Sequence, residues 1–199
     1  RVPVNIVLTE RKHRSVGAGI SYKTDEGPGL SASWENRNLS GGGEQLAFAA
    51  TFSDYVFSAE GGYLKPFFLR KDQFLRLSAR LADDQPDAYS SRNLKSYFMI
   101  ERSITEGLKL GGGLGFKVSR VTQLEETNRY SFLLFPLTME YNGSDDLLDP
   151  SRGSRLGMQV TPHWDPFKGN PEFAKGYGRY RHYLQILKEP STVLAGGIG

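Results

Sequence analysis

Clusters of acidic residues are the first features of this sequence whose spacing could do chemistry. They lie at Asp83–Asp84, at Glu125–Glu126 and at Asp145–Asp149. Neighbouring carboxylates can bind a cation, but the last cluster lacks the glycine that a calcium-binding loop needs at its sixth position. All three clusters fall between segments with the pattern of strands, so we interpret them as solvated turn residues.

A glycine cluster at Gly111–Gly115 is the second candidate, because glycine-rich loops can hold phosphate groups. The dinucleotide-binding fingerprint would need a further glycine where Phe116 or Val118 stands. The sequence also contains no GK[ST] phosphate loop and no GxSxG nucleophile motif. Cysteine is absent, and the three histidines are too far apart for an HExxH metal site. The residues therefore predict no enzyme activity, no metal site and no cofactor.

The composition narrows the class of protein further. The chain has 199 residues with 25 basic and 22 acidic side chains, a formal net charge of +3. This even balance argues against a nucleic-acid partner. The longest apolar run, Phe132–Leu137, contains a proline and is far shorter than the roughly 20 residues of a membrane-spanning helix. The sequence opens at Arg1 without a signal peptide, so we expect it to be a piece of a longer protein.

Most of the chain alternates apolar and polar residues with a period of two, which is typical of strands with one apolar and one polar face. The pattern is clearest in Arg14–Lys23, Gly107–Ser119 and Gly153–Trp164. The predicted strands have roughly ten residues each, the length that spans a bilayer when tilted, whereas strands of soluble proteins average about five or six. Less regular strands are predicted at Leu30–Leu39, Glu44–Phe52, Tyr55–Lys65, Gln73–Ala82, Asn93–Ser103, Arg129–Tyr141, Tyr177–Lys188 and Thr192–Gly199.

The connections between these strands suggest an orientation. Long polar connections are predicted at Asp83–Arg92, Arg120–Asn128 and Asp165–Gly176, with mostly shorter ones between them. Outer-membrane barrels have long loops outside and short turns on the periplasmic side. We therefore expect these three connections to be extracellular.

Several charged residues fall on the polar faces of the predicted strands, where a barrel would enclose a wet interior. The same pattern fits the solvent face of a soluble antiparallel sheet, so this alternative stays open. Glycines on the lumen face, such as those of Gly111–Gly115, would let backbone or an internal plug approach closely. The predicted lumen-facing charges are Glu35, Arg37, Glu60, Arg76, Arg80, Lys109, Lys117 and Arg155.

Particular segments resemble a known family. Val2–Arg11 looks like the closing strand of a polypeptide-transport-associated (POTRA) domain. Val16–Tyr22 and Trp34–Glu44, the latter with the sequence WENRNLSGGGE, are similar to the start of the barrel in the BamA/TamA outer-membrane assembly superfamily. Phe68–Gln73 and Leu147–Gly153 resemble further segments of that family. Within the superfamily, the resemblance is greatest to the TamA branch.

The resemblance implies an all-β fold, an up-and-down antiparallel transmembrane β-barrel of which this chain is the N-terminal portion of sixteen strands. Residues 1–13 would be the end of a POTRA domain and a hinge, and residues 14–199 a partial barrel. It also implies insertion or secretion of outer-membrane proteins, including autotransporters, in the outer membrane of Gram-negative bacteria without nucleotide hydrolysis. The implied partners are membrane lipid, unfolded clients and a periplasm-spanning TamB-like protein. The family's VRGY-type loop would lie beyond Gly199.

The first strand of the predicted barrel is the candidate for the functional site. In the family the first and last strands meet at a weak seam, and glycines weaken the packing of a strand. An underpaired strand presents N–H and C=O groups to which a client strand can add, and leaving such groups unpaired in lipid is costly. The residues of this client-accepting edge are Val16, Gly17, Ala18, Gly19, Ile20, Ser21 and Tyr22.

Two other functions fit parts of the pattern. A secretion pore of the two-partner type would have a fixed channel, steady ion conductance and one dedicated exported client. A soluble all-β binding module would purify without detergent as a folded monomer. Strand length and the family segments argue against the soluble module.

Overall fold

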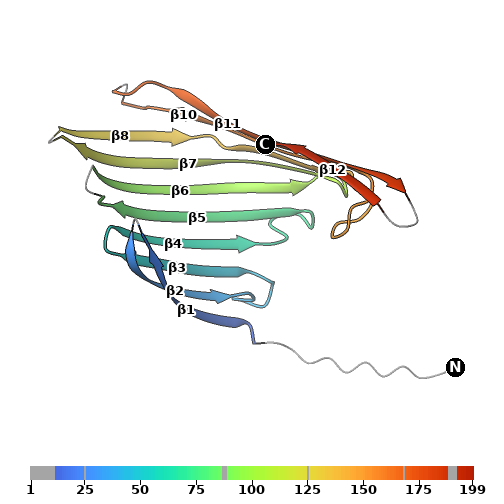
Figure 1. Ribbon diagram of the computed structural model, residues 1–199, viewed down its shortest axis with the longest axis horizontal. Helices are drawn as coiled ribbons and strands as arrows, with labels where there is room; N and C mark the ends of the chain where they lie inside the picture. The colour runs from blue at the N-terminus through green and yellow to red at the C-terminus, as the bar shows by residue number, and fades with distance from the viewer. Residues whose placement is uncertain (1–11, 25, 87–88, 125, 168, 188–191) are drawn as a thin grey trace.

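The computed structural model describes residues 12–24, 26–86, 89–124, 126–167, 169–187 and 192–199. These residues form one curved antiparallel sheet and contain no helix (Figure 1). Within this part of the chain no helix could therefore serve as a membrane span. The predicted POTRA strand lies in residues 1–11, outside the described residues.

The sheet contains twelve strands in sequence order. Each strand pairs with its neighbour in the chain, except where β8 and β9 share one place between β7 and β10. This confirms the predicted up-and-down antiparallel fold. The strands are β1 (Arg14–Lys23), β2 (Gly27–Asn36), β3 (Gln45–Ser53), β4 (Val56–Lys65), β5 (Gln73–Asp84), β6 (Ser90–Ser103), β7 (Leu108–Gln123), β8 (Glu126–Leu134), β9 (Leu137–Asn142), β10 (Gly153–Trp164), β11 (Phe173–Leu187) and β12 (Thr192–Ile198).

The predicted strand Arg129–Tyr141 is divided in two by Pro136, which has no N–H to donate to a ladder. β8 pairs with the second half of β7, and β9 pairs with the first half. Two hydrogen bonds hold the break in the sheet. The Gly113 N–H donates to the Pro136 carbonyl over 3.1 Å, and the Phe135 N–H donates to the Pro162 carbonyl over 3.1 Å.

The predicted long connections at 83–92 and 120–128 are wrong, because these polar segments continue the hairpins as strands. Asp83 pairs with Arg92, and Arg120 pairs with Arg129, so the connections shrink to residues 85–89 and 124–125. The third predicted connection remains a longer one, at 165–172. The connections at this end of the sheet are therefore not longer as a group than those at the opposite end, contrary to the prediction. At the opposite end the connections are 37–44, 66–72, 104–107, 143–152 and 188–191.

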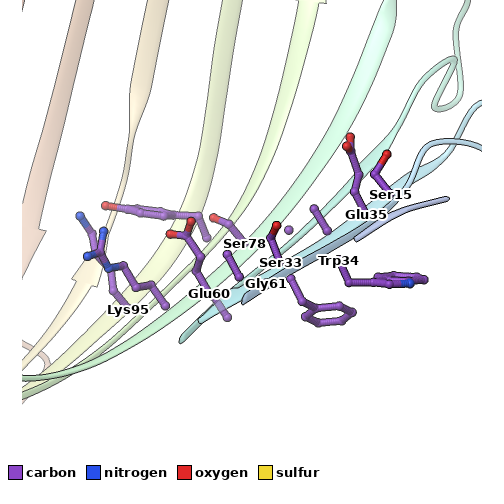
Figure 2. Close-up of a pocket in the computed structure, with 15 residues that line it drawn as sticks. Ser15, Ser33, Trp34, Glu35, Glu60, Gly61, Ser78 and Lys95 are labelled. Atoms are coloured by element: carbon purple, nitrogen blue, oxygen red, sulfur yellow. The ribbon is translucent and has the colours of Figure 1, made fainter. Parts of the chain in front are cut away.

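The two faces of the sheet differ in chemistry. We call the outer face the one that carries Val16, Trp34 and Phe48, which the strand register places side by side. The opposite side is the inner face. Figure 2 shows Glu35 and Glu60 on the concave side of the sheet and Trp34 on the other. The inner face is therefore concave and polar.

The sheet does not enclose an apolar core. Among the described residues, the buried apolar side chains are Leu75, Phe132 and Leu134. The accessible surface is 14831 Å², whereas a compact protein of 22.2 kDa would expose about 9,400 Å². Large apolar side chains on the outer face are exposed instead. This distribution fits a sheet whose outer face contacts an apolar phase, and it does not provide the core that a soluble module needs.

Candidate functional site

The first predicted site, β1, is an end strand of the sheet. Within the described residues it pairs only with β2. The ladder begins with the Arg37 N–H, which donates to the His13 carbonyl over 2.9 Å. In an antiparallel ladder the hydrogen-bonded pairs alternate, so residues 15, 17, 19 and 21 bond to β2. The N–H and C=O groups of residues 14, 16, 18, 20 and 22 therefore point to the open edge.

The side chains of β1 add little packing to this pair. On the inner face Gly17 lies opposite Ser33, and Gly19 lies opposite Ser31. On the outer face Val16 and Ile20 are 81% and 88% exposed. All ten residues of β1 are exposed, in contrast to the partly buried strands in the middle of the sheet. β1 is held mainly by its backbone ladder to β2.

The second predicted site is the set of lumen-facing charges, and the structure brings most of it onto one face. The strand register places seven of the eight on the inner face, whether or not that face encloses a lumen. Arg37 is the exception, because it follows the last residue of β2 and pairs with Glu35 over 3.0 Å. The seven are Glu35, Glu60, Arg76, Arg80, Lys109, Lys117 and Arg155.

One row of inner-face charges runs straight across four strands. Glu60 lies opposite Arg80, Arg80 opposite Lys95, and Lys95 opposite Lys117. Figure 2 shows Glu60 and Lys95 on the same concave side. With Lys175 of β11, Lys95 and Lys117 line a hollow of about 260 Å³. The middle of the inner face is therefore positively charged.

Sequence reasoning missed Lys95, Lys175 and Glu101. Glu101 forms an ion pair with Arg76, with Arg76 Nε and Glu101 Oε1 3.1 Å apart. The alternation in the sequence did indicate this face for Lys95 and Glu101, since residues an even number apart in one strand share a face. This indication was obscured because the alternation of β6 is less regular than that of β7.

Backbone and side-chain atoms of β6 approach Gly113 and Gly115 of β7 closely. A Cβ atom at Gly115 would lie 2.5 Å from the Tyr97 ring, and one at Gly113 would collide with the Phe98 carbonyl. The predicted close approach at these glycines is therefore made by the neighbouring strand of the same sheet. Glycine is needed here for space, because neither position has a positive φ.

Arg155 of β10 is held by hydrogen bonds to the connection 143–152. Its guanidinium donates to the Ser144 hydroxyl over 3.0 Å and to the Asp146 and Leu147 carbonyls over 2.9 Å. In the same connection the Asp145 carboxylate accepts the backbone N–H groups of Arg152, Ser151 and Asp146.

These bonds, led by the one from Arg152, hold the pKa of Asp145 below its ordinary value against the opposing effect of burial. The connection that contains this acidic cluster is thus a bonded turn. In the described part of the chain no group of three or more histidine, cysteine or acidic residues could hold a metal ion.

The chain resembles known proteins in sequence and in the arrangement of its strands. The model of the Omp85 superfamily domain matches residues 38–199. A search of curated protein sequences found no match. Among solved structures, the chain is similar to the crystal structure of BamA from Haemophilus ducreyi lacking POTRA domains 1-3, with a TM-score of 0.73 and 16% identity. The match covers 94% of this chain and 40% of that one, so the chain spans less than half of the BamA structure.

Proposed function

This chain belongs to the Omp85 superfamily, and we propose that it forms the first part of the barrel of a factor that inserts or translocates outer-membrane proteins. Its place is the outer membrane of a Gram-negative bacterium, with the apolar outer face against lipid. The clients are unfolded outer-membrane proteins. The proposed function uses no nucleotide hydrolysis, no cofactor and no making or breaking of covalent bonds.

The observation that carries the proposal is the weak packing of β1, whose inner side places Gly17 and Gly19 opposite Ser33 and Ser31. Five residues of this strand direct their N–H and C=O groups away from β2. In hydrocarbon each unpaired backbone group costs several kcal/mol, so an edge at membrane depth favours any strand that supplies the missing bonds. A client strand that adds to β1 would gain its own bonds at the same time.

The weak side-chain packing of β1 supports exchange at this edge. A strand fixed by large interdigitated side chains would resist the local movements that admit a client. Gly17 and Gly19 leave the inner side of β1 nearly bare, and the hydroxyl groups of Ser33 and Ser31 fill the space beside them. The β1 to β2 ladder can remain intact while the open edge changes its partner.

Within this function we assign the chain to the TamA-like branch, with autotransporters among its clients and a TamB-like protein as the periplasm-spanning partner. The resemblance of the sequence as a whole, which is greatest to that branch, supports the assignment. A two-partner secretion pore is the second candidate, because the polar inner face would also line a fixed water-filled channel. Steady conductance of the full-length protein in planar bilayers would favour the pore.

Proline substitution of the full-length protein tests the open edge. Ala18→Pro removes an N–H group that points to the edge and leaves the bonds of Gly17 and Gly19 to β2 in place. Ala18→Val keeps that N–H and is the matched control. We expect Ala18→Pro to abolish client insertion into vesicles while the protein still inserts itself, and Ala18→Val to remain active. Equal client insertion by the two variants would refute the proposed edge.

A further inference from the structure

A row of charged residues crosses the outer face near one end of the sheet. Asp83 of β5 lies opposite Arg92 of β6, Arg92 opposite Arg120 of β7, and Arg120 opposite Arg129 of β8. Directly opposed residues of an antiparallel sheet point to the same face, so these four side chains stand side by side. We call this set the arginine row. At about 4.8 Å between strands, it extends for about 14 Å.

The arginine row marks the boundary of the apolar surface. The next outer-face residues toward the middle of the sheet include Leu81, Leu94 and Val118, which are 45%, 38% and 46% exposed. The next residues toward the turn include Thr122 and Thr127, whose hydroxyl oxygens are 2.9 Å apart. The chemistry of the outer face thus changes from aliphatic to cationic to hydroxyl within a few residues.

The charges of the row are not balanced by the protein. Arg92 Nε is 2.8 Å from Asp83 Oδ2, which accounts for the one carboxylate. Arg120 and Arg129 form no ion pair with any described residue, although like charges in directly opposed positions destabilise a sheet. The opposite end of the outer face differs, because Arg102 there pairs with Asp72 over 2.6 Å.

We propose that the arginine row binds the phosphate groups of lipid headgroups. Guanidinium groups bind phosphate in a two-pronged geometry, and neighbouring strands place two of them within reach of one phosphate. A lipid satisfies both parts of the boundary, since its acyl chains lie along Leu94 and Val118 while its phosphate meets the arginines. A free anion has no such reason to bind at the margin of an apolar surface. The inference rests on the membrane location in the proposed function but not on client insertion.

The test measures lipid retained by the full-length protein. The protein is reconstituted in phosphatidylcholine vesicles that contain one tenth phosphatidylglycerol or lipid A, extracted in neutral detergent, and analysed by native mass spectrometry. One charge near the surface changes affinity about fivefold, so Arg120→Gln with Arg129→Gln should weaken retention of the anionic lipid about 25-fold. The matched control, Arg179→Gln with Arg181→Gln on the inner face of β11, should retain it unchanged.

A variant that should retain more of the anionic lipid distinguishes loss of binding from loss caused by misfolding. Asp83→Asn removes the carboxylate that neutralises Arg92, so it should strengthen retention about fivefold.

Equal retention by wild type and the Arg120 and Arg129 double variant would overturn the proposal. Displacement of the lipid by inorganic phosphate as a simple competitor would overturn it too, because the row would then be a free-anion site. Client insertion into pure phosphatidylcholine vesicles should be normal in the double variant, which separates this test from that of the β1 edge.

Discussion

Replacing Gly113 by alanine tests the close packing of β6 over the glycines of β7. The added Cβ would collide with the Phe98 carbonyl oxygen and would lie 2.9 Å from the Met99 Cα. Both atoms belong to the backbone of the neighbouring strand, so no side-chain rotation can relieve the contact. Gly157 of β10 is the matched control, because no atom lies within 4 Å of a Cβ placed there.

The magnitude follows from these two environments. Forcing an extra carbon into a packed site costs typically about 1–3 kcal/mol, and we expect the upper half of that range because backbone must move. Gly157→Ala should instead stabilise the fold by about 0.4–1 kcal/mol, through the reduced freedom of the unfolded chain. The two variants should therefore differ by about 3 kcal/mol, a factor of more than about 100 in the unfolding equilibrium.

Urea unfolding of the full-length protein in detergent micelles measures this difference. Trp34 and Trp164, the two tryptophans of this chain, lie on the outer face and report loss of the apolar environment by fluorescence. The free energies of unfolding come from linear extrapolation. If Gly113→Ala and Gly157→Ala unfold at the same urea concentration, β6 does not cover the β7 glycines as described.

Three further predictions concern the connections. The turn 143–152 should lose order as the pH falls below about 4, and hydrogen exchange of the Arg152 amide measures this loss. The pKa of Asp145 is lowered in the folded state, so its contribution to stability is complete above the ordinary carboxyl pKa and is lost as the pH falls toward the folded-state pKa. Asp165→Ala should speed exchange of the Gly169 and Asn170 amides about tenfold, because both donate to its buried carboxylate. Leu69→Gly should raise the unfolding free energy by up to about 1 kcal/mol in the same urea experiment, because Leu69 is exposed with a φ of 61°.

The strand pattern was predictable because its cause is local. β1 and β10 begin and end where the alternation predicts, since each alternating segment has one face that suits an apolar phase. The superfamily resemblance is confirmed by the match over residues 38–199. The branch within the superfamily stays a prediction.

The hairpin ends were mispredicted because polarity was taken as the mark of a loop. Segments 83–92 and 120–128 consist mostly of polar residues, yet most of their backbone groups continue the ladders. A strand requires paired backbone rather than apolar side chains, so a hairpin that extends past the apolar surface reads as a loop in the sequence. The same error hid Arg92 and Arg120 as strand residues.

The side-by-side arrangement of charges required the register. Alternation tells which face Lys95 or Arg92 occupies, but not which residue of the next strand lies opposite. That pairing depends on the lengths of the turns, which differ from those the sequence predicts. The row from Glu60 to Lys117 and the arginine row were therefore beyond reach of the sequence alone.

The most direct test of the β1 edge is cross-linking to a client during assembly. This chain contains no cysteine, so Ala18→Cys gives it a single thiol on the open strand, and Ala59→Cys in the middle of the sheet is its control. A client barrel carries single cysteines along one terminal strand. We predict that Ala18→Cys forms a disulfide with one position of that strand and that Val16→Cys shifts the partner by two residues. Cross-links from Ala59→Cys as strong as those from Ala18→Cys, or none from β1, would contradict strand addition at this edge.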